Sequence, residues 1–337
     1  MTLNTVETDT NVAKPQWYRD LGDYAHSDMR KAIIQIITTF TPYLALWSLM
    51  IYLVLNDFPY WMVLLVVPFQ AAITLRIFII FHDCCHGSFF KSNRLNTIFG
   101  YLTGTLTFTP FRQWRAHHNA HHATSGDLDR RGMGDIGLLT IEEYRQLTTL
   151  SKLKYRFSRN PFVIFGLGSI WIFMFVHRFT KKVDDKKTIR SVWITNFFIL
   201  IYISALGLTI GFLPYIKIAL PVMYVSGAIG IWMFYVQHQF EDAYWRMHSE
   251  WDQFAAGIKG SSYYKLPKIL HWVSGNIGFH HIHHLHPRIP NYHLQRCFRE
   301  IKALSEVEPL TILMSLKLPW LSLWDEGSQK LVGYRSL

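Results

Sequence analysis

Four long stretches of apolar residues alternate with polar segments along the chain. They cover residues 32–55, 59–81, 191–215 and 218–237, and Arg76 is the only charged residue within them. Each stretch is long enough for a helix that crosses the hydrocarbon core of a bilayer, which takes about 20 residues. Arg76 lies near one end of its stretch, so its long side chain is expected to extend to the interface. The pattern predicts an all-α membrane protein with four transmembrane helices.

Two weaker apolar stretches, 95–111 and 161–176, are predicted to be interfacial or re-entrant. The first is rich in threonine and glycine, and the second offers only 16 residues before His177. An even number of crossings also keeps every histidine-rich segment on the same side of the membrane. We therefore expect both stretches to lie against the membrane without crossing it.

The distribution of charge predicts the orientation. The chain has 34 Lys and Arg against 23 Asp and Glu, a net charge of +11. With four crossings, Lys217 is the only basic residue in an outer loop, so the positive-inside rule places the cytoplasm on the other side. We expect a cytosolic segment at 1–31, a membrane domain at 32–237 that contains part of a helical cap at 82–190, and the rest of the cap at 238–337. The expected location is the inner or plasma membrane, with both termini and the active site cytoplasmic. This topology explains the basic charge without nucleic acid as a partner.

Histidine is the unusual residue of the composition. The chain has 17 histidines, and most of them lie in three clusters: HDCCH at 82–86, WRAHHNAHH at 114–122 and HHIHHLHP at 280–287. Side chains three or four positions apart share one face of a helix. The histidines that share a face in this way are His82 and His86, then His118, His121 and His122, then His280, His283 and His284.

These clusters predict a metal centre. Neutral imidazole is the commonest metal ligand in proteins, and one cluster alone would also suit a structural zinc ion or a pH sensor. Eight imidazoles exceed the roughly four to six ligands of one ion, so two metal ions are predicted. His238, directly after the last crossing, is a ninth candidate ligand. His117 and His281 do not fit the H-x-x-H-H register and are left out of the set.

Neutral ligands leave the charge of the metal ions uncompensated. Carboxylates that accept a hydrogen bond from the second ring nitrogen of a ligand would orient it and raise its basicity. The candidates for this role are Asp83, Asp127, Asp129, Asp135, Glu241 and Asp242. Arg115 is expected to pair with one of these or with a lipid phosphate.

The motifs HDCCH, WRAHHNAHH and GNIGFHHIHHLHP resemble the three histidine boxes of integral-membrane fatty acid desaturases. The stretches FHDCCHGSFF, DLDRRGMGDI, FYVQHQFEDAYW, GSSYYKLPK and RIPNYHLQ are similar to the bacterial acyl-lipid desaturases, the delta-5 group most closely. The resemblance covers roughly residues 30–330.

The resemblance implies a di-iron centre that activates O2 and removes two hydrogens from the acyl chain of a membrane phospholipid. By motif match, the eight box histidines become the ligands of two iron ions, with His238 as a further one. The resemblance also implies that a separate ferredoxin- or flavodoxin-type protein supplies the electrons. The chain contains no G-x-G-x-x-G motif, which agrees with a separate donor.

An acyl substrate that partitions into the bilayer must reach the metals through an apolar tunnel. Trp114, Trp245, Trp251, Trp272 and Tyr263 are candidates to line it, although such aromatic residues are equally expected as anchors at the interface.

Two other functions use the same residues. A membrane di-iron hydroxylase or ketolase begins with the same hydrogen abstraction and differs in whether oxygen is added to the carbon. A histidine-rich metal transporter or sensor needs ionisable residues inside its crossing helices, where this chain has only Arg76. Desaturation is favoured by the similarity outside the boxes.

Overall fold

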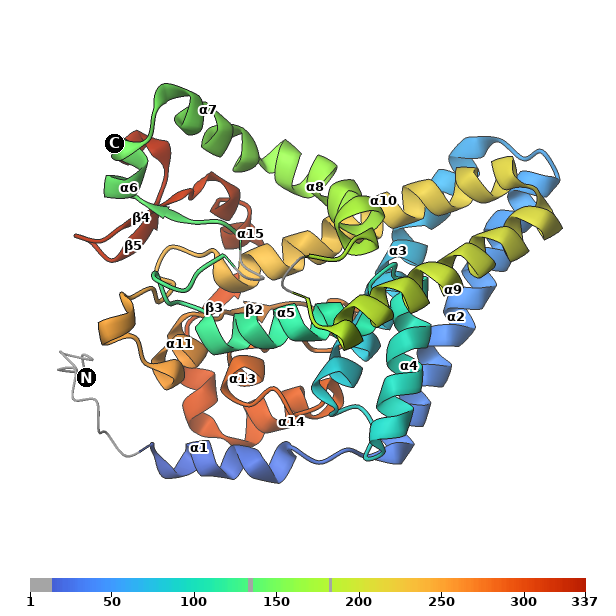
Figure 1. Ribbon diagram of the computed structural model, residues 1–337. Coiled ribbons are helices and arrows are strands. Elements are labelled where there is room, and N and C mark those ends of the chain that lie inside the picture. The colour runs from blue at the N-terminus through green and yellow to red at the C-terminus, as the bar shows by residue number, and fades with distance from the viewer. Residues whose placement is uncertain (1–13, 133–135, 182–183) are drawn as a thin grey trace.

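The structure of the protein is a computed structural model that describes residues 14–132, 136–181 and 184–337. Four long helices dominate it, and each is long and apolar enough to cross a membrane. They are α2 (Met29–Leu55), α3 (Tyr60–His86), α9 (Lys186–Ile210) and α10 (Phe212–His238). Figure 1 shows them converging on one side of the molecule, with the shorter elements gathered on the other. The prediction of an all-α membrane fold with four transmembrane helices is confirmed.

The turn between α9 and α10 lies earlier than the sequence predicted. Predicted crossings at 191–215 and 218–237 put this turn beside Lys217, but the chain reverses at Gly211 and Lys217 lies inside α10. Gly211 has a φ of 92°, a conformation that glycine adopts without strain. Pro214 follows in the first turn of α10, where its missing N–H leaves no hydrogen bond unmade. The prediction of these boundaries was wrong because it followed charge rather than backbone geometry.

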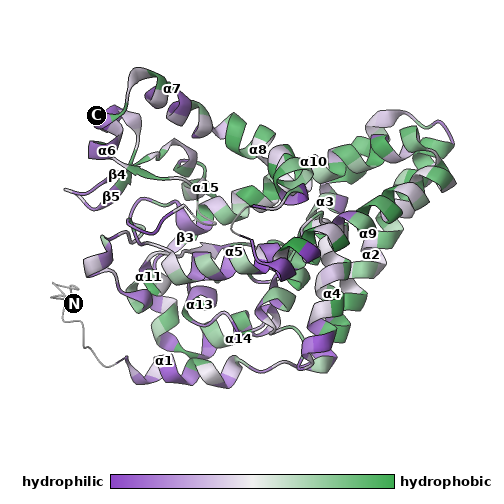
Figure 2. Cartoon of the chain, viewed as in Figure 1, coloured by the Kyte–Doolittle hydropathy of each residue, from purple (hydrophilic) through white to green (hydrophobic). Residues whose placement is uncertain are grey.

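The four helices pack on one another through a narrow apolar core. Met50, Val63 and Ile218 are fully buried there, and Trp47 stacks on Tyr215 with 6.2 Å between ring centroids. The outward faces are just as apolar, as Figure 2 shows. These exposed large side chains include Leu65, Phe69, Leu200 and Leu208. Such a continuous apolar surface is typical of contact with lipid rather than water.

Arg76 is buried against other parts of the protein. Its side chain is only 6% exposed, and its Nε donates to Oγ1 of Thr39 on α2 at 3.0 Å. The guanidinium lies 4.2 Å from the ring of Trp272 and donates to the Trp272 carbonyl. Trp272 belongs to α12 (Lys268–Val273), so the buried cation connects two transmembrane helices to the rest of the molecule.

Both weaker apolar stretches form short or broken helices. The first becomes α4 (Asn93–Leu106), a 14-residue helix beside α3 and α9. The second follows α7 (Thr149–Ser158) and is divided into η2 (Phe162–Leu167), α8 (Gly168–Ile170), η3 (Trp171–Phe175) and η4 (Val176–Arg178). η2 and η3 are π-helical, and the chain bends by 59° after α7. A bend of this size does not fit a straight crossing.

The remaining elements form a cap at one end of the four helices. Its helices are α1 (Gln16–Asp20), η1 (Leu21–Tyr24), α5 (Phe111–Thr124), α6 (Ile141–Gln146), η5 (His248–Glu250), α11 (Gln253–Lys259), α13 (His280–Leu285), α14 (Asn291–Glu300), η6 (Lys302–Glu306), α15 (Ile312–Ser315), η7 (Leu318–Trp320) and η8 (Tyr334–Ser336). Two small sheets join them. In one, β4 (Leu323–Asp325) pairs in parallel with β1 (Leu139–Thr140) and antiparallel with β5 (Lys330–Val332). In the other, β2 (Tyr263–Lys265) and β3 (Pro309–Thr311) are parallel.

Candidate metal centre

The first histidine pair sits at the end of a transmembrane helix. His82 and His86 occupy the last turns of α3 and, four residues apart, point the same way. The helix stops directly after His86 because Gly87 takes the left-handed conformation, with a φ of 69°. The chain therefore turns away from the helix axis directly after His86, and the two imidazoles stay uncovered by the residues that follow.

α5 supplies three more imidazoles from one short helix. It begins after Pro110, and His118, His121 and His122 lie in its second half. His118 is held by Trp114, one turn earlier, whose ring stacks on it at 4.2 Å between centroids. The opposite face, which includes Arg115, is exposed. The helix thus presents its histidines to the interior and its basic residues to the outside.

The third cluster lies on α13, a helix of six residues that is almost entirely buried. Its position depends on a close approach of the preceding chain to β2. A Cβ added at Gly278 would lie 2.6 Å from the carbonyl oxygen of Tyr264, so only glycine fits there. His280, His283 and His284 face the other clusters. His281 points away, toward the rings of Tyr263 and Phe298.

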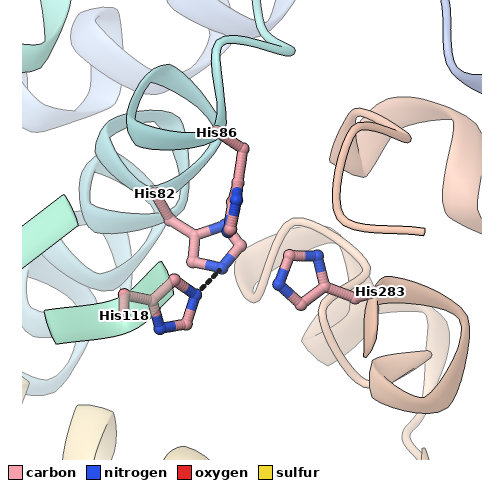
Figure 3. A group of neighbouring side chains, drawn as sticks. All are labelled: His82, His86, His118 and His283. Atoms are coloured by element: carbon pink, nitrogen blue, oxygen red, sulfur yellow. Dashed lines mark hydrogen bonds between the residues drawn. The ribbon is translucent and has the colours of Figure 1, made fainter. Parts of the chain in front are cut away.

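All nine candidate histidines converge at the junction of α3, α5, α10 and α13. One group comprises His82, His86, His118 and His283, whose nearest ring nitrogens lie within 4.8 Å of one another, as in Figure 3. A second group comprises His121, His238 and His284. Two further histidines adjoin these groups. His122 lies 3.1 Å from His118 and 2.9 Å from His283, and His280 lies 2.9 Å from His238, all between Nε2 atoms.

The nitrogens face one another in a way that hydrogen bonding alone does not explain. Nε2 of His118 lies 3.1 Å from Nε2 of His82 and 3.1 Å from Nε2 of His122. A ring nitrogen carries either a hydrogen or a lone pair, so it satisfies at most one such neighbour well. Nε2 of His86 and Nε2 of His284 are buried without a hydrogen-bond partner. Inward-facing lone pairs of this kind are what a bound metal ion requires.

Burial favours the neutral form of five of these imidazoles. For the members outside the transmembrane helices, burial lowers the pKa well below its usual value, and neighbouring histidines lower the pKa further. They are His118, His122, His280, His283 and His284. A neutral imidazole is the form that binds a metal ion.

Asp83 is the carboxylate that lies directly behind one of the histidines. It is 2% exposed, and its Oδ1 lies 3.1 Å from Nδ1 of His82. Its Oδ2 accepts from the backbone N–H and the side-chain amide of Asn291, at 2.7 and 2.8 Å. Asn291 begins α14 and was not singled out from the sequence, since no spacing rule connects it to Asp83. The carboxylate orients His82 and also fastens α14 to α3.

The other candidate carboxylates have different partners. Asp127 is fully buried and accepts from Arg130 at 2.5 Å and from Nδ1 of His248 at 2.8 Å. Asp129 accepts from the backbone N–H of His248. Glu241 and Asp242 lie at the surface, 3.3 and 3.1 Å from the Lys330 ammonium. Asp135 lies outside the described residues.

His238 has a backbone partner in place of a carboxylate. It is the last residue of α10, and its Nδ1 lies 3.3 Å from the carbonyl oxygen of Gly260. Its Nε2 lies 3.1 Å from Nε2 of His121. His238 thus lies at the end of a transmembrane helix, α10, as His82 and His86 lie at the end of α3.

A cavity of about 390 Å³ reaches the histidines from the side of the membrane helices. Trp114 and His118 line the cavity where it approaches the histidine groups. The other walls are mostly apolar and include Leu75, Phe173 and Phe234. Its walls come from α3, α4, α5, η3 and α10. Of the five aromatic residues considered from the sequence, Trp114 lies among those that line the cavity.

Fold and site together define a class: a membrane protein with a histidine-rich group that can hold a metal centre, next to an apolar cavity. Within that class, the chain belongs to the fatty acid desaturase family, whose family model matches residues 59–313. The resemblance of the histidine boxes is thereby confirmed at the level of the family.

Three relatives illustrate the range of the family. The chain is 42% identical to a fatty acid desaturase of Bacillus subtilis (strain 168), over 96% of this chain and 91% of that protein. It is 26% identical to an endoplasmic-reticulum omega-3 fatty acid desaturase of Vigna radiata, over 70% of this chain and 63% of that protein. It is also 26% identical to an sn-1 oleoyl-lipid 12-desaturase of Synechocystis, over 67% of this chain and 64% of that protein.

Proposed function

We propose that the protein is an O2-dependent acyl-lipid desaturase that introduces a cis double bond with two iron ions held by the nine histidines. The observation that carries the proposal is the convergence of nine imidazoles from four separate elements beside an apolar cavity. Membership of the fatty acid desaturase family supports acyl desaturation as the reaction.

The donor set fits a redox-active metal pair. The nine imidazoles are too numerous for one ion, since an ion takes roughly four to six ligands. Iron bound there would supply the oxidant for an unactivated C–H bond, chemistry for which zinc has no redox state. In this proposal His82, His86, His118 and His283 hold one ion, His121, His238 and His284 hold the other, and His122 and His280 complete the two shells.

The residues of the chain position the substrate. An acyl chain in the cavity would lie against Leu75, Phe173 and Phe234 and end beside Trp114, which fixes the ring of His118. These apolar walls exclude water from the reacting methylenes. Lys181 is the only charged residue among the described residues that line the cavity, so we place the anionic headgroup of a phospholipid toward it.

The overall reaction requires a donor. One acyl chain, O2, two electrons and two protons yield the alkene and two waters, so two electrons must come from outside. We propose a ferredoxin- or flavodoxin-type protein that approaches the cap from the cytoplasm, with the protein in the plasma membrane and both termini on the cytoplasmic side. The basic character of the chain supports this orientation through the positive-inside rule.

The decisive experiment is expression in a host that makes no unsaturated lipids, followed by mapping of double bonds in its extracted phospholipids. The wild-type chain should produce acyl chains two hydrogens lighter, and His284→Ala should produce none at equal membrane content. Products heavier by one oxygen would establish a hydroxylase and overturn desaturation. The mapped position also tests the delta-5 specificity suggested by the sequence motifs.

Metal analysis tests the iron proposal separately. Protein purified from iron-supplied cells should contain about two iron ions per chain, as the number of imidazoles requires. Zinc alone, with no O2-dependent activity after loading with Fe2+, would overturn it.

A further inference from the structure

The outer face of α7 is apolar and uncovered among the described residues. Leu150, Leu153 and Phe157 are 62%, 60% and 64% exposed, respectively. Their spacing of three and four residues places them in one stripe along the helix. Three large apolar side chains in a row are unusual on a surface that faces water.

The inner face of α7 is fastened to the cap, so the orientation of the stripe is fixed. The hydroxyl of Tyr155 donates to the carbonyl of Ser322 at 2.5 Å and accepts from the backbone N–H of Leu139 at 3.2 Å. Nε of Arg156 donates to the hydroxyl of Tyr144 at 2.7 Å. The helix cannot turn its apolar stripe inward without losing these bonds.

α7 is anchored at its C-terminal end by Arg159, which is 3% exposed. Its guanidinium donates to the side chain of Gln239 and to the carbonyl of Leu321, both at 3.0 Å. Gln239 directly follows α10, so a transmembrane helix and α7 share this contact. The stripe is therefore held at the junction of the cap and the membrane helices.

The stripe continues into the broken apolar segment. Phe162, Leu167 and Trp171 are 82%, 60% and 61% exposed along η2 and η3. This segment packs on α10, where Ser169 and Phe173 approach Gly227. Figures 1 and 2 show the hydrophobic α8 region connecting α7 to the transmembrane helices. The exposed apolar surface of α7 is thus followed along the chain by a second exposed apolar surface, on a segment that packs against α10.

Charge at the stripe suits an anionic surface. Lys154 lies beside the stripe and is exposed. Lys152 and Arg156 are directed to the cap, over the rings of Tyr144 and Tyr334. α7 contains no Asp or Glu. An apolar stripe with an exposed lysine beside it and no acidic residue on the helix suits the headgroup region of a membrane.

We propose that α7 and residues 162–178 form an interfacial arm, which lies in the leaflet at the cap end of the transmembrane helices and binds anionic lipid. Lipid, rather than a second protein, covers the stripe. The inner side of the same arm contributes Ile172, Phe173 and Val176 to the cavity wall. Lipid seated on the arm is therefore separated from the cavity by a single irregular helix.

The native cysteines allow a direct test by site-specific labelling. Cys84, Cys85 and Cys297 are buried, so wild-type protein in vesicles serves as the unlabelled blank. Single variants Leu153→Cys on the stripe, Leu200→Cys on a transmembrane helix and Glu142→Cys on the cap each receive an environment-sensitive fluorophore. The vesicles contain phosphatidylglycerol with brominated acyl chains, and iodide is added as an aqueous quencher.

The label at position 153 should be quenched by brominated lipid, as at position 200, and protected from iodide. Quenching by iodide to the extent seen at position 142 would place the arm in water and overturn the proposal. Protection from both quenchers would show that another protein surface covers the stripe and would also overturn it. Because the readout involves no catalysis, its failure is distinguishable from a failure of the proposed desaturase activity.

The role of charge is tested with Lys154→Glu in the same labelled background. Lipid quenching at position 153 should decrease in phosphatidylglycerol vesicles and remain unchanged in vesicles of neutral phosphatidylcholine. An equal decrease in both vesicle types, or none in either, would contradict recognition of anionic lipid.

Discussion

Two histidines of the candidate centre, one from each group, differ in what stands behind them. His82, in the first group, has the buried carboxylate of Asp83 at 3.1 Å. His238, in the second group, has only the backbone carbonyl of Gly260 at 3.3 Å. Both partners orient an imidazole at the end of a transmembrane helix, but only the carboxylate brings a negative charge.

This difference shows that two imidazoles at the ends of transmembrane helices can be oriented by different kinds of partner. A carboxylate behind a ligand raises its basicity and offsets part of the metal charge, whereas a carbonyl only fixes the ring. Asp83 also receives two hydrogen bonds from Asn291. His82 is therefore coupled to the packing of α14, and His238 to Gly260, the residue that follows α11.

The largest effect is expected on removal of an imidazole from either group. We expect His284→Ala and His121→Ala to abolish desaturation, because each leaves a coordination position empty. The protein should remain in the membrane, since the four transmembrane helices are unchanged. Double bonds in extracted lipids measure activity, and membrane fractionation measures insertion. Full activity in either variant would refute its assignment as a ligand.

Asp83→Asn tests the carboxylate behind His82. Loss of the charge behind His82 should lower activity about 10- to 100-fold, the effect usual for partners of metal ligands. Asp242→Asn is the matched control, because that carboxylate is exposed and pairs with Lys330. An Asp83→Asn enzyme with wild-type activity and iron content would mean that His82 does not need a charged partner.

His280 and His281 are neighbours in one cluster, but only His280 faces the candidate centre. His280→Ala should abolish activity, whereas His281→Ala should retain most of it, since this ring packs against Tyr263 and Phe298. The cavity left by His281→Ala should lower the unfolding free energy by about 2 kcal/mol. Thermal unfolding in detergent and lipid analysis measure the two quantities. Equal loss of activity in both variants would contradict this distinction.

The smallest effect is expected at Glu241. Its side chain is 60% exposed and 3.3 Å from Lys330, so Glu241→Gln should change stability by less than about 1 kcal/mol. Activity should also stay within twofold of wild type in the lipid assay. A tenfold loss of activity would show that this carboxylate acts on the candidate centre despite its position at the surface.

Local periodicity made much of the architecture predictable. The four apolar stretches gave the transmembrane helices, and spacings of three and four gave the histidines of each cluster that share a face. The contacts of Arg76 and the turn at Gly211 could not be predicted from local periodicity. The partner of Arg76 is Trp272, almost two hundred positions away, and the turn at Gly211 depends on a backbone angle that hydropathy does not report.

The amino-acid sequence by itself determined which residues lie on which helical face, because helix geometry repeats within a few residues. Only the tertiary structure decided how those faces meet. His121 and His122 are neighbours in one motif, yet His121 joins His238 and His284 while His122 adjoins His118 and His283. Likewise, Asp83 rather than Asp127 lies behind an imidazole of the candidate centre. The physical reason is that such pairings depend on the packing of elements distant in the chain, which no local pattern encodes.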